Sequence, residues 1–499
     1  MCYDFNKGYF LIFRRQGVKG TFGVGFDVFV VFRQRSCVQD LPEISKKGRL
    51  SQMKATVIIM KKTIAFILVM AMFILALPFA AFADGAVIKV GTAAELAAME
   101  SGKSYKLTAD VTLDSSWTTI PEFAGTLDGN GYTVTLNTSA PMFDKLTGTV
   151  KNVVFKGNVT LKTDDVSKDT LTKWDTSGGG HKYAVGALAC QAIGATVEQV
   201  KFSAGVTFVQ DDKTVTPVAV GAMFGAAVTG ADKKPTTIDN VNFNGNLDVR
   251  FDTAEKSARC SVGGVVAFMS YNVDISNVLF TGNVSATNCS AYAGGIVGYN
   301  YNEGNLDFDV STLTNCFFNG SVAKVNSSGE RAGGLVGYSN GITMLNCAAN
   351  AQKVTINGNR DSSCCGLLAY GSGGSTHKVL VKNCVDVNSS SRPMCLNNAE
   401  ATSENNIYTC SGNGIANGKA VNLKQIANAN EALSTFATDN SAFTFAEGTL
   451  TLTTVSDPVT VPEPVAPNVP TGDMTVWFVV AAMISLAGIA IVSKKKVNE

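Results

Sequence analysis

One unit recurs through most of this chain, and residues 331–354 show it most clearly. The stretch RAGGLVGYSNGITMLNCAANAQKV holds two short apolar runs, Gly-Leu-Val-Gly-Tyr and Ile-Thr-Met-Leu-Asn-Cys, joined by a Ser-Asn-Gly turn. A unit of about 20–50 residues that repeats along a chain buries its apolar face by stacking on its neighbours. The repeat therefore predicts a solenoid.

Two strand types alternate through the repeats. The first type is small and Gly-rich: YAVGALAC (183–190), VAVGAMFG (218–225), SVGGVVAF (261–268), YAGGIVGY (292–299), RAGGLVGY (331–338) and CCGLLAYG (364–371). The second type carries an Asn, or a substitute, before an apolar residue, and that position recurs at intervals of 31 to 47 residues: Asn152, Gln199, Asn240, Asn277, Asn315, Asn346 and Asn383.

This pattern predicts an all-β fold, a parallel β-helix in which each strand pairs with its equivalent one coil on, about 4.8 Å away. Alternation places Val, Ile, Leu and Phe inside, while asparagines at one turn position form a hydrogen-bonded ladder and tolerate the left-handed bend. We expect about ten coils. A β-sandwich is the alternative fold, but it does not predict strict alternation of two strand types.

Short caps are expected at both ends of the solenoid. Residues 87–90 and 105–113 read as strands, and the capping box Thr92-Ala93-Ala94-Glu95 opens a helix that runs to about residue 100. Near the other end, 423–436 predicts a helix and 443–454 a hairpin. We expect this helix and hairpin to close the last coil, because an open solenoid edge invites unwanted pairing.

The Gly-rich strands resemble the GLUG repeat of bacterial surface proteins. The segment 331–338 keeps the Gly-Leu-any-Gly motif. The glycines of the repeat in segments 292–299 and 331–338 are Gly294, Gly295, Gly333, Gly334 and Gly337. The resemblance covers roughly residues 86–450 and implies a right-handed parallel β-helix. Members of this family include adhesins, structural stalks and appendages to enzymes. Its immunoglobulin-cleaving metalloproteases carry a His-Glu-x-x-His zinc site, which this sequence lacks.

The N-terminal region predicts export. Met60-Lys61-Lys62, the apolar run 64–79 and the Ala81-Phe82-Ala83 site before Asp84 have the layout of a secretory signal peptide, and a membrane anchor is the alternative. Residues 1–59 have no place before such a peptide. We therefore interpret them as the product of a start codon called too early, with Met53 or Met60 as the true start.

The C-terminal region predicts attachment to the cell surface. The 19-residue apolar stretch 474–492 is long enough to cross a membrane as a helix, and the lysines that follow it should stay cytoplasmic. The order of Pro470-Thr471-Gly472, apolar span and basic tail resembles the sorting signal that sortase attaches to the cell wall of Gram-positive bacteria. The usual Leu-Pro-x-Thr-Gly motif is incomplete here, so a plain membrane anchor is the alternative. The Pro-rich segment before the motif predicts an extended spacer.

These features divide the chain into seven segments. They are residues 1–59 (not structural), 60–83 (signal peptide), 84–140 (N-terminal cap and first coils), 141–415 (repeats), 416–456 (C-terminal cap), 457–472 (spacer and sorting-like motif) and 473–499 (transmembrane helix and basic tail).

Composition limits the classes of molecule that this chain is expected to bind. Only 16% of the residues are charged and the net charge is +1, so the chain has no basic surplus for nucleic acid and no acidic surplus for cations. The motifs predict no cofactor. The partners that remain are an extracellular glycan or protein, and peptidoglycan or membrane at the anchor.

Cysteines replace valines in one repeat column. Cys316, Cys347 and Cys384 follow the ladder asparagines directly, where earlier repeats carry valine. We interpret them as small buried hydrophobes. Disulfides between stacked coils are an alternative, but the Cβ geometry of parallel stacking is poor. Metal binding has little support, because the chain has no Cys-x-x-Cys and only two histidines.

No residue stands out as catalytic. The carboxylate pairs Asp164-Asp165 and Asp211-Asp212 could serve a glycosidase, which needs two carboxyl groups beside the scissile bond, but both pairs lie in polar loops typical of solvated turns. His181 and His377 lie beside Gly-rich turns, where a lone histidine is usually solvated. We interpret the chain as not an enzyme.

The sequence therefore favours a cell-surface rod that acts as an adhesin or ligand-binding protein. A polysaccharide-active hydrolase or lyase on a β-helix is the first alternative, and a passive wall stalk is the second. A specific ligand should contact the parts that differ between repeats, such as residues 163–181, 210–217 and 300–310.

Overall fold

The computed structural model describes residues 11–15, 26–30 and 87–459. The last range has gaps at 168–182, 212–217, 252–258, 303–306, 327–330, 360–362, 374–376, 388–391, 398–399, 411–418 and 422. The chain divides into two compact units, Met1–Ala83 and Asp84–Glu499. In the first unit the described residues form one antiparallel pair, β1 (Leu11–Arg15) with β2 (Phe26–Val30).

Both targeting segments lie outside the described residues. Ala81, Ala83 and Asp84 of the expected cleavage site and Pro470, Thr471 and Gly472 of the sorting-like motif are among them, as is the apolar stretch 474–492. Within the described parts of the chain, no helix is both long and apolar enough to span a membrane.

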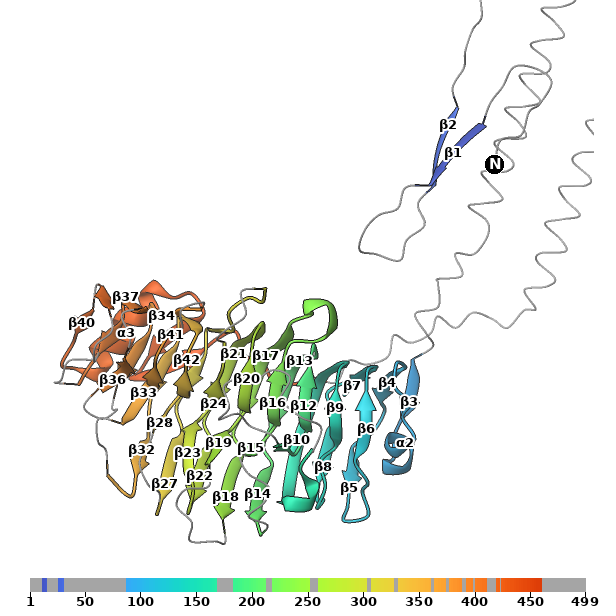
Figure 1. The fold of residues 1–499 in the computed structure, drawn as a ribbon, viewed down its shortest axis with the longest axis horizontal. Coiled ribbons are helices and arrows are strands. Elements are labelled where there is room, and N and C mark those ends of the chain that lie inside the picture. The colour runs from blue at the N-terminus through green and yellow to red at the C-terminus, as the bar shows by residue number, and fades with distance from the viewer. Residues whose placement is uncertain are drawn as a thin grey trace, which may run out of the picture. The chain divides into compact units, whose positions relative to one another are not determined.

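The second unit is a solenoid of parallel strands (Figure 1). Along its first sheet every coil contributes one strand, or two strands split at the ladder position, and each pairs in parallel with the next coil. Each coil is named here after its first strand. In chain order these are β4 (Ser104–Leu107), β7 (Thr126–Asp128), β10 (Thr149–Lys162), β13 (Thr196–Phe202), β17 (Thr236–Phe243), β21 (Val273–Phe280), β25 (Thr312–Thr314), β30 (Ile342–Leu345), β34 (Val379–Lys382), β37 (Ala401–Glu404) and β39 (Lys419–Val421).

The first sheet also holds shorter strands. The N-terminal ones are β3 (Ile88–Val90), β5 (Val111–Leu113) and β8 (Thr133–Leu136). The second halves of the later coils are β26 (Phe317–Phe318), β31 (Ala348–Asn350), β35 (Val385–Val387), β38 (Ile407–Tyr408) and β40 (Lys424–Gln425). The single strand expected over 105–113 is therefore wrong, because a turn separates β4 from β5.

The second sheet is formed by the end of β10 and by the strands that follow the ladder. They are β14 (Gly205–Gln210), β18 (Asn246–Phe251), β22 (Asn283–Thr287), β27 (Ser321–Val325) and β32 (Lys353–Ile356).

The third sheet contains the Gly-rich segments, most of them as two short strands with a corner between. Its leading row is β11 (Tyr183–Gly186), β15 (Val218–Gly221), β19 (Arg259–Gly263), β23 (Ser290–Gly294) and β28 (Ala332–Gly333). Its trailing row is β6 (Ile120–Phe123), β9 (Phe143–Leu146), β12 (Ala189–Ile193), β16 (Phe224–Val228), β20 (Val266–Ser270), β24 (Val297–Asn300), β29 (Val336–Ser339), β33 (Cys364–Gly371) and β36 (Arg392–Leu396).

A stack of phenylalanine rings runs through the core beneath the first sheet. Successive coils contribute Phe202, Phe243, Phe280 and Phe318, with ring centroids 5.4, 4.7 and 5.4 Å apart and rings nearly parallel. All four are fully buried. The expectation that strand alternation places the large apolar residues inside is confirmed.

The N-terminal cap forms where the capping box predicts it. Helix α2 (Ala93–Ala97) begins after Thr92, whose Oγ1 accepts a hydrogen bond from the Glu95 amide at 3.2 Å. The Glu95 carboxylate accepts in turn from the Gly91 amide at 2.8 Å, which lowers the pKa of that carboxyl group. The helix ends before Gly102, which has a positive φ of 84°.

The C-terminal helix and hairpin lie against the side of the solenoid. Helix α3 (Ala429–Asp439) begins later than expected, because Asn428 caps it by accepting from the Glu431 amide at 3.1 Å. The hairpin of β41 (Phe443–Ala446) and β42 (Thr449–Leu452) is confirmed. Both pack in one apolar cluster with outward residues of the first sheet, including Phe317, Ala348, Val385 and Ile407. The expected position across the last coil is therefore wrong.

Candidate functional site

The ladder residues form a column that crosses the middle of the first-sheet strands. All seven column residues have positive φ values, between 50° and 54°, which Asn tolerates better than other non-glycine residues. In the later coils the amides hydrogen-bond along the column: the Nδ2 of Asn315, Asn346 and Asn383 donates to the previous coil's Oδ1 at 3.3, 3.4 and 3.4 Å. Asn277 donates to Asp239 at 2.7 Å.

The repeat glycines permit close packing at the corner of the third sheet. A Cβ atom on Gly294 or Gly333 would lie 1.9 Å from the carbonyl oxygen of Val297 or Val336. A Cβ atom on Gly295 or Gly334 would lie 2.3 Å from a carbonyl oxygen of the next coil, and a Cβ atom on Gly337 would lie 2.6 Å from the carbonyl oxygen of Gly298. These glycines are therefore structural.

The cysteines of the repeat column are buried in the core. Cys316, Cys347 and Cys384 are completely inaccessible to solvent, and they are free thiols. Burial raises the pKa of Cys316 and Cys384 well above the usual value. Among the described residues, no group of three or more His, Cys, Asp or Glu side chains could hold a metal ion.

The one described histidine is not solvated. His377 is 8% exposed, and its Nε2 lies 2.9 Å from the carbonyl oxygen of Phe308. Its ring also packs edge-on against Tyr271. The expectation of a solvated loop position is wrong for His377, while His181 lies outside the described residues.

Three of the four expected carboxylates are described, and Asp165 lies near Asp211 of the next coil at the end of the second sheet. Burial raises the pKa of Asp165, and the neighbouring Asp164 and Asp211 carboxylates raise it further, against a backbone hydrogen bond from Lys162. Lys162 N donates to Asp165 Oδ2 at 2.6 Å, and Asp211 N donates to Thr163 Oγ1 at 3.1 Å. Asp212 lies outside the described residues. These carboxyl groups come from successive coils, β10 and β13.

A row of tyrosines lies on the outer face of the third sheet, here called the tyrosine stripe: Tyr292, Tyr299, Tyr338 and Tyr370. Tyr299 and Tyr338 occupy equivalent positions of β24 and β29. The Tyr292 and Tyr338 ring centroids are 4.6 Å apart, those of Tyr299 and Tyr338 5.1 Å, and those of Tyr338 and Tyr370 5.1 Å. All four side chains are partly exposed.

Polar groups surround the tyrosine stripe. The guanidinium of Arg331 lies 4.6 Å from the ring centroid of Tyr370 and donates to Ser363 Oγ at 3.1 Å. The hydroxyl of Tyr338 lies 3.3 Å from Ser372 Oγ. Asn397 donates to the hydroxyl of Tyr370. The stripe therefore combines ring edges with fixed hydrogen-bonding groups and one cation.

The register explains why the sequence pattern alone did not single out this stripe. Tyr299 stands in a column that carries Lys145, Gln191, Ala226 and Phe268 in earlier coils. Only the later coils have tyrosine there, so the column is not a feature of every repeat. The signal was the last aromatic of YAGGIVGY, RAGGLVGY and CCGLLAYG, once these strands are placed side by side.

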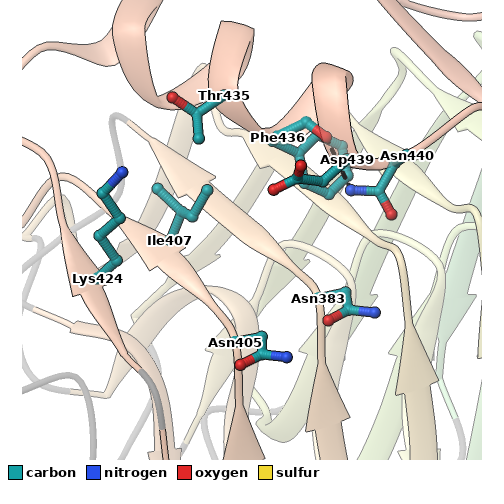
Figure 2. A pocket seen from close by; sticks show the side chains of 8 residues that line it. All are labelled: Asn383, Asn405, Ile407, Lys424, Thr435, Phe436, Asp439 and Asn440. Atoms are coloured by element: carbon teal, nitrogen blue, oxygen red, sulfur yellow. Dashed lines mark hydrogen bonds between the residues drawn. The ribbon is translucent and has the colours of Figure 1, made fainter.

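A hollow lies between α3 and the first sheet (Figure 2). Its volume is about 410 Å³, within the range of small-molecule sites. Ile407 and Phe436 supply its apolar surface, and Lys424 on the sheet faces Asp439 on the helix. Asn383, Asn405, Thr435 and Asn440 complete the lining. The lining is therefore mixed, with two apolar side chains beside charged and amide groups.

The loops expected to bind a ligand are only partly described. Residues 163–167, 210–211, 300–302 and 307–310 of the expected segments 163–181, 210–217 and 300–310 are visible. Asn300 and Asn302 are buried, and both donate side-chain hydrogen bonds to Gly341 O. In this part of the third loop the side chains hold adjacent coils together.

The strand pairings define the second unit as a parallel β-solenoid. No family model and no curated protein matches the sequence. Among solved structures, a candidate immunoglobulin A1 protease from Bacteroides ovatus aligns with a TM-score of 0.42 and 16% identity, over 75% of this chain and 94% of that one. An IgA1 protease aligns with a TM-score of 0.41 and 15% identity, over 61% of this chain and only 21% of its own length. At these values neither similarity says what this chain does.

Proposed function

We propose that this protein is a surface-anchored, non-catalytic rod that binds an extracellular glycan through the tyrosine stripe. The observation that carries the proposal is the row of partly exposed tyrosines on successive coils, with centroids about 5 Å apart. Such a row offers similar contacts at regular steps, which suits a linear polymer of repeated units.

The chemistry of the stripe supports a polyhydroxylated ligand. Tyrosine has an apolar ring and a hydroxyl that both donates and accepts, and with two side-chain torsions it loses little entropy on binding. Packing against neighbouring rings restricts Tyr338 further before any ligand arrives. Arg331 adds a cation at one end, which would favour a glycan with some acidic groups.

The anchor in this proposal comes from the sequence. Export through the 60–83 signal peptide, followed by sortase cleavage between Thr471 and Gly472, would attach the rod to peptidoglycan on the extracellular face. Without cleavage, the apolar stretch 474–492 would hold it in the membrane. The proposal also places the solenoid among right-handed β-helices of the GLUG type.

The binding experiment uses the full-length chain on an array of linear neutral and acidic polysaccharides. Tyr299→Ala and Tyr338→Ala should each weaken binding about tenfold or more, because aromatic side chains at the centre of a binding surface contribute on this scale. Tyr408→Ala, a partly exposed tyrosine on the first sheet, should change nothing. Binding that survives the loss of both stripe tyrosines would contradict the proposal, and an array with no binding would favour the passive stalk.

The acid group around Asp165 favours one second candidate, a polysaccharide hydrolase. A carboxyl group with a raised pKa beside other carboxylates is the arrangement that supplies a general acid. Incubating each polysaccharide with the protein and measuring chain length tests this candidate. Shortening that disappears in Asp165→Asn would establish cleavage that depends on Asp165, and unchanged chain lengths would support the non-catalytic rod.

A further inference from the structure

The segment after the C-terminal hairpin runs back across the outside of the solenoid. Ser456 lies against the β17 coil, where its amide donates to Asn240 Oδ1 at 2.8 Å and Asn240 Nδ2 donates to Ser456 Oγ at 3.0 Å. Val459 lies against the β10 coil, where its amide donates to Asn152 Oδ1 at 2.9 Å and Asn152 Nδ2 donates to Val459 O at 3.0 Å. Residues 456–459 are here called the strap.

Asp457 contacts the coils between these two points. Its carboxylate accepts from Lys201 Nζ at 2.6 Å and from Asn242 Nδ2 at 2.8 Å. Gln199 Nε2 donates to its carbonyl oxygen at 3.4 Å. Gln199 is the one ladder residue of the column that is not Asn, and its longer side chain reaches the middle of the strap.

The geometry of the strap matches the spacing of the coils. From Ser456 to Val459 is three residues, about 10 Å of extended chain. From the β17 coil to the β10 coil is two coil steps, also about 10 Å. Pro458 suits the segment because its ring favours extended backbone and its position needs no N–H donor.

The hydrogen-bond partners of the ladder residues differ between the coils under the strap and the later coils. In the later coils the side-chain amides of the column hydrogen-bond to one another. Asn152 and Asn240 instead use both the side-chain oxygen and the side-chain nitrogen to hydrogen-bond to the strap. An amide that offers its donor and acceptor together recognises an extended backbone in the way a neighbouring strand does.

We propose that the ladder amides of the β10, β13 and β17 coils are a docking surface for the strap, so that the chain leaves the rod beside its N-terminal coils. The occupant is this chain's own segment 456–459. The tyrosine stripe, four coils further on at Tyr338, lies on the other half of the rod from Val459. The display of the stripe rests on the proposed function, but the docking does not.

Hydrogen exchange of the full-length chain tests the docking. The Ser456 and Val459 amides should be protected, and Asn152→Gly with Asn240→Gly should raise their exchange rates about tenfold or more, because four hydrogen bonds are lost. Glycine keeps the positive φ of both sites. Asn315→Gly with Asn346→Gly, in the same column beyond the strap, is the matched control and should leave the two amides unchanged.

A photo-crosslinking residue at position 459 tests where the chain leaves the rod. Crosslinks within one molecule to the β10 and β13 coils are expected. Crosslinks to the C-terminal coils, or between two copies of the chain, would overturn the proposal, as would rapid exchange of the Ser456 and Val459 amides in the unmodified chain. Tyrosine variants that fail to affect glycan binding would leave these results untouched, so the two proposals fail separately.

Discussion

At the scale of single residues, the glycines of the third sheet show how the repeat restricts its sequence. At Gly334 an added methyl group would lie 2.3 Å from the carbonyl oxygen of Gly366 and 2.6 Å from the Phe318 ring. Neither neighbour can move away, because the Gly366 carbonyl is backbone of the next coil and the Phe318 ring belongs to the phenylalanine stack. The glycine is therefore required by packing in this corner.

Gly334→Ala should lower the free energy of unfolding by about 1–3 kcal/mol, the usual cost of overpacking a dense core. Urea denaturation followed by circular dichroism measures the change. Gly205→Ala is the control, because the nearest atom to its added methyl is the side-chain oxygen of Asn158 at 3.0 Å, which can move. Equal losses in both variants would show that the corner has no special packing constraint.

Single residues also show what the sequence could and could not predict. The ladder asparagines were predictable because Asn at a fixed place in each repeat has a local reason, the positive φ. The tyrosine stripe was not, since its tyrosines meet only through the register between coils. Buried Lys324 and Asp386 were unexpected too, because both stand in inward columns that carry apolar residues in neighbouring coils.

At the scale of elements, the outer face of the first sheet explains where the C-terminal segments dock. One outward column carries Lys201 and Asn242 in the β13 and β17 coils, and these hold the strap. The same column then becomes apolar, with Leu279, Phe317, Ala348, Val385 and Ile407, beneath α3 and the hairpin. The existence of helix and hairpin was predictable from local patterns, but their place was not, because it depends on this column.

Phe436→Ala should release α3 from the sheet while the solenoid stays folded. Phe436 is 2% exposed and its ring lies 4.9 Å from that of Phe443, so truncation should cost about 3–5 kcal/mol. Hydrogen exchange should show lost protection in 429–452 and unchanged protection in β13 and β17. Ser434→Ala, on the exposed side of the same helix, is the control. Loss of protection throughout the coils would mean that α3 is part of the solenoid core.

At the scale of the whole molecule, the solenoid is a row of coils that contact only their neighbours. Its stability is then a sum of coil and interface contributions, and it can open from an end. In the described part of the last coil, the short strands β39 and β40 are what it contributes to the first sheet. The β10 coil has long strands with neighbours on both sides and the strap across its outer face.

The ten described cysteines can report how the coils open, because they are distributed from Cys190 in the β10 coil to Cys410 near the end. Cys410 is partly exposed and the other nine of these ten are buried. Burial raises the pKa of Cys190 and Cys365 far above 9.0, so in the folded chain they should stay protonated and unreactive toward alkylation even at pH 9. Above that pH the unfolded thiols ionise and the folded ones do not, so the free energy of unfolding should fall as the pH rises.

Pulsed alkylation in increasing urea, read by mass spectrometry, should label Cys410 first, then Cys384 and Cys395, and Cys190 last. Simultaneous labelling of all ten would instead show that the coils unfold as one unit.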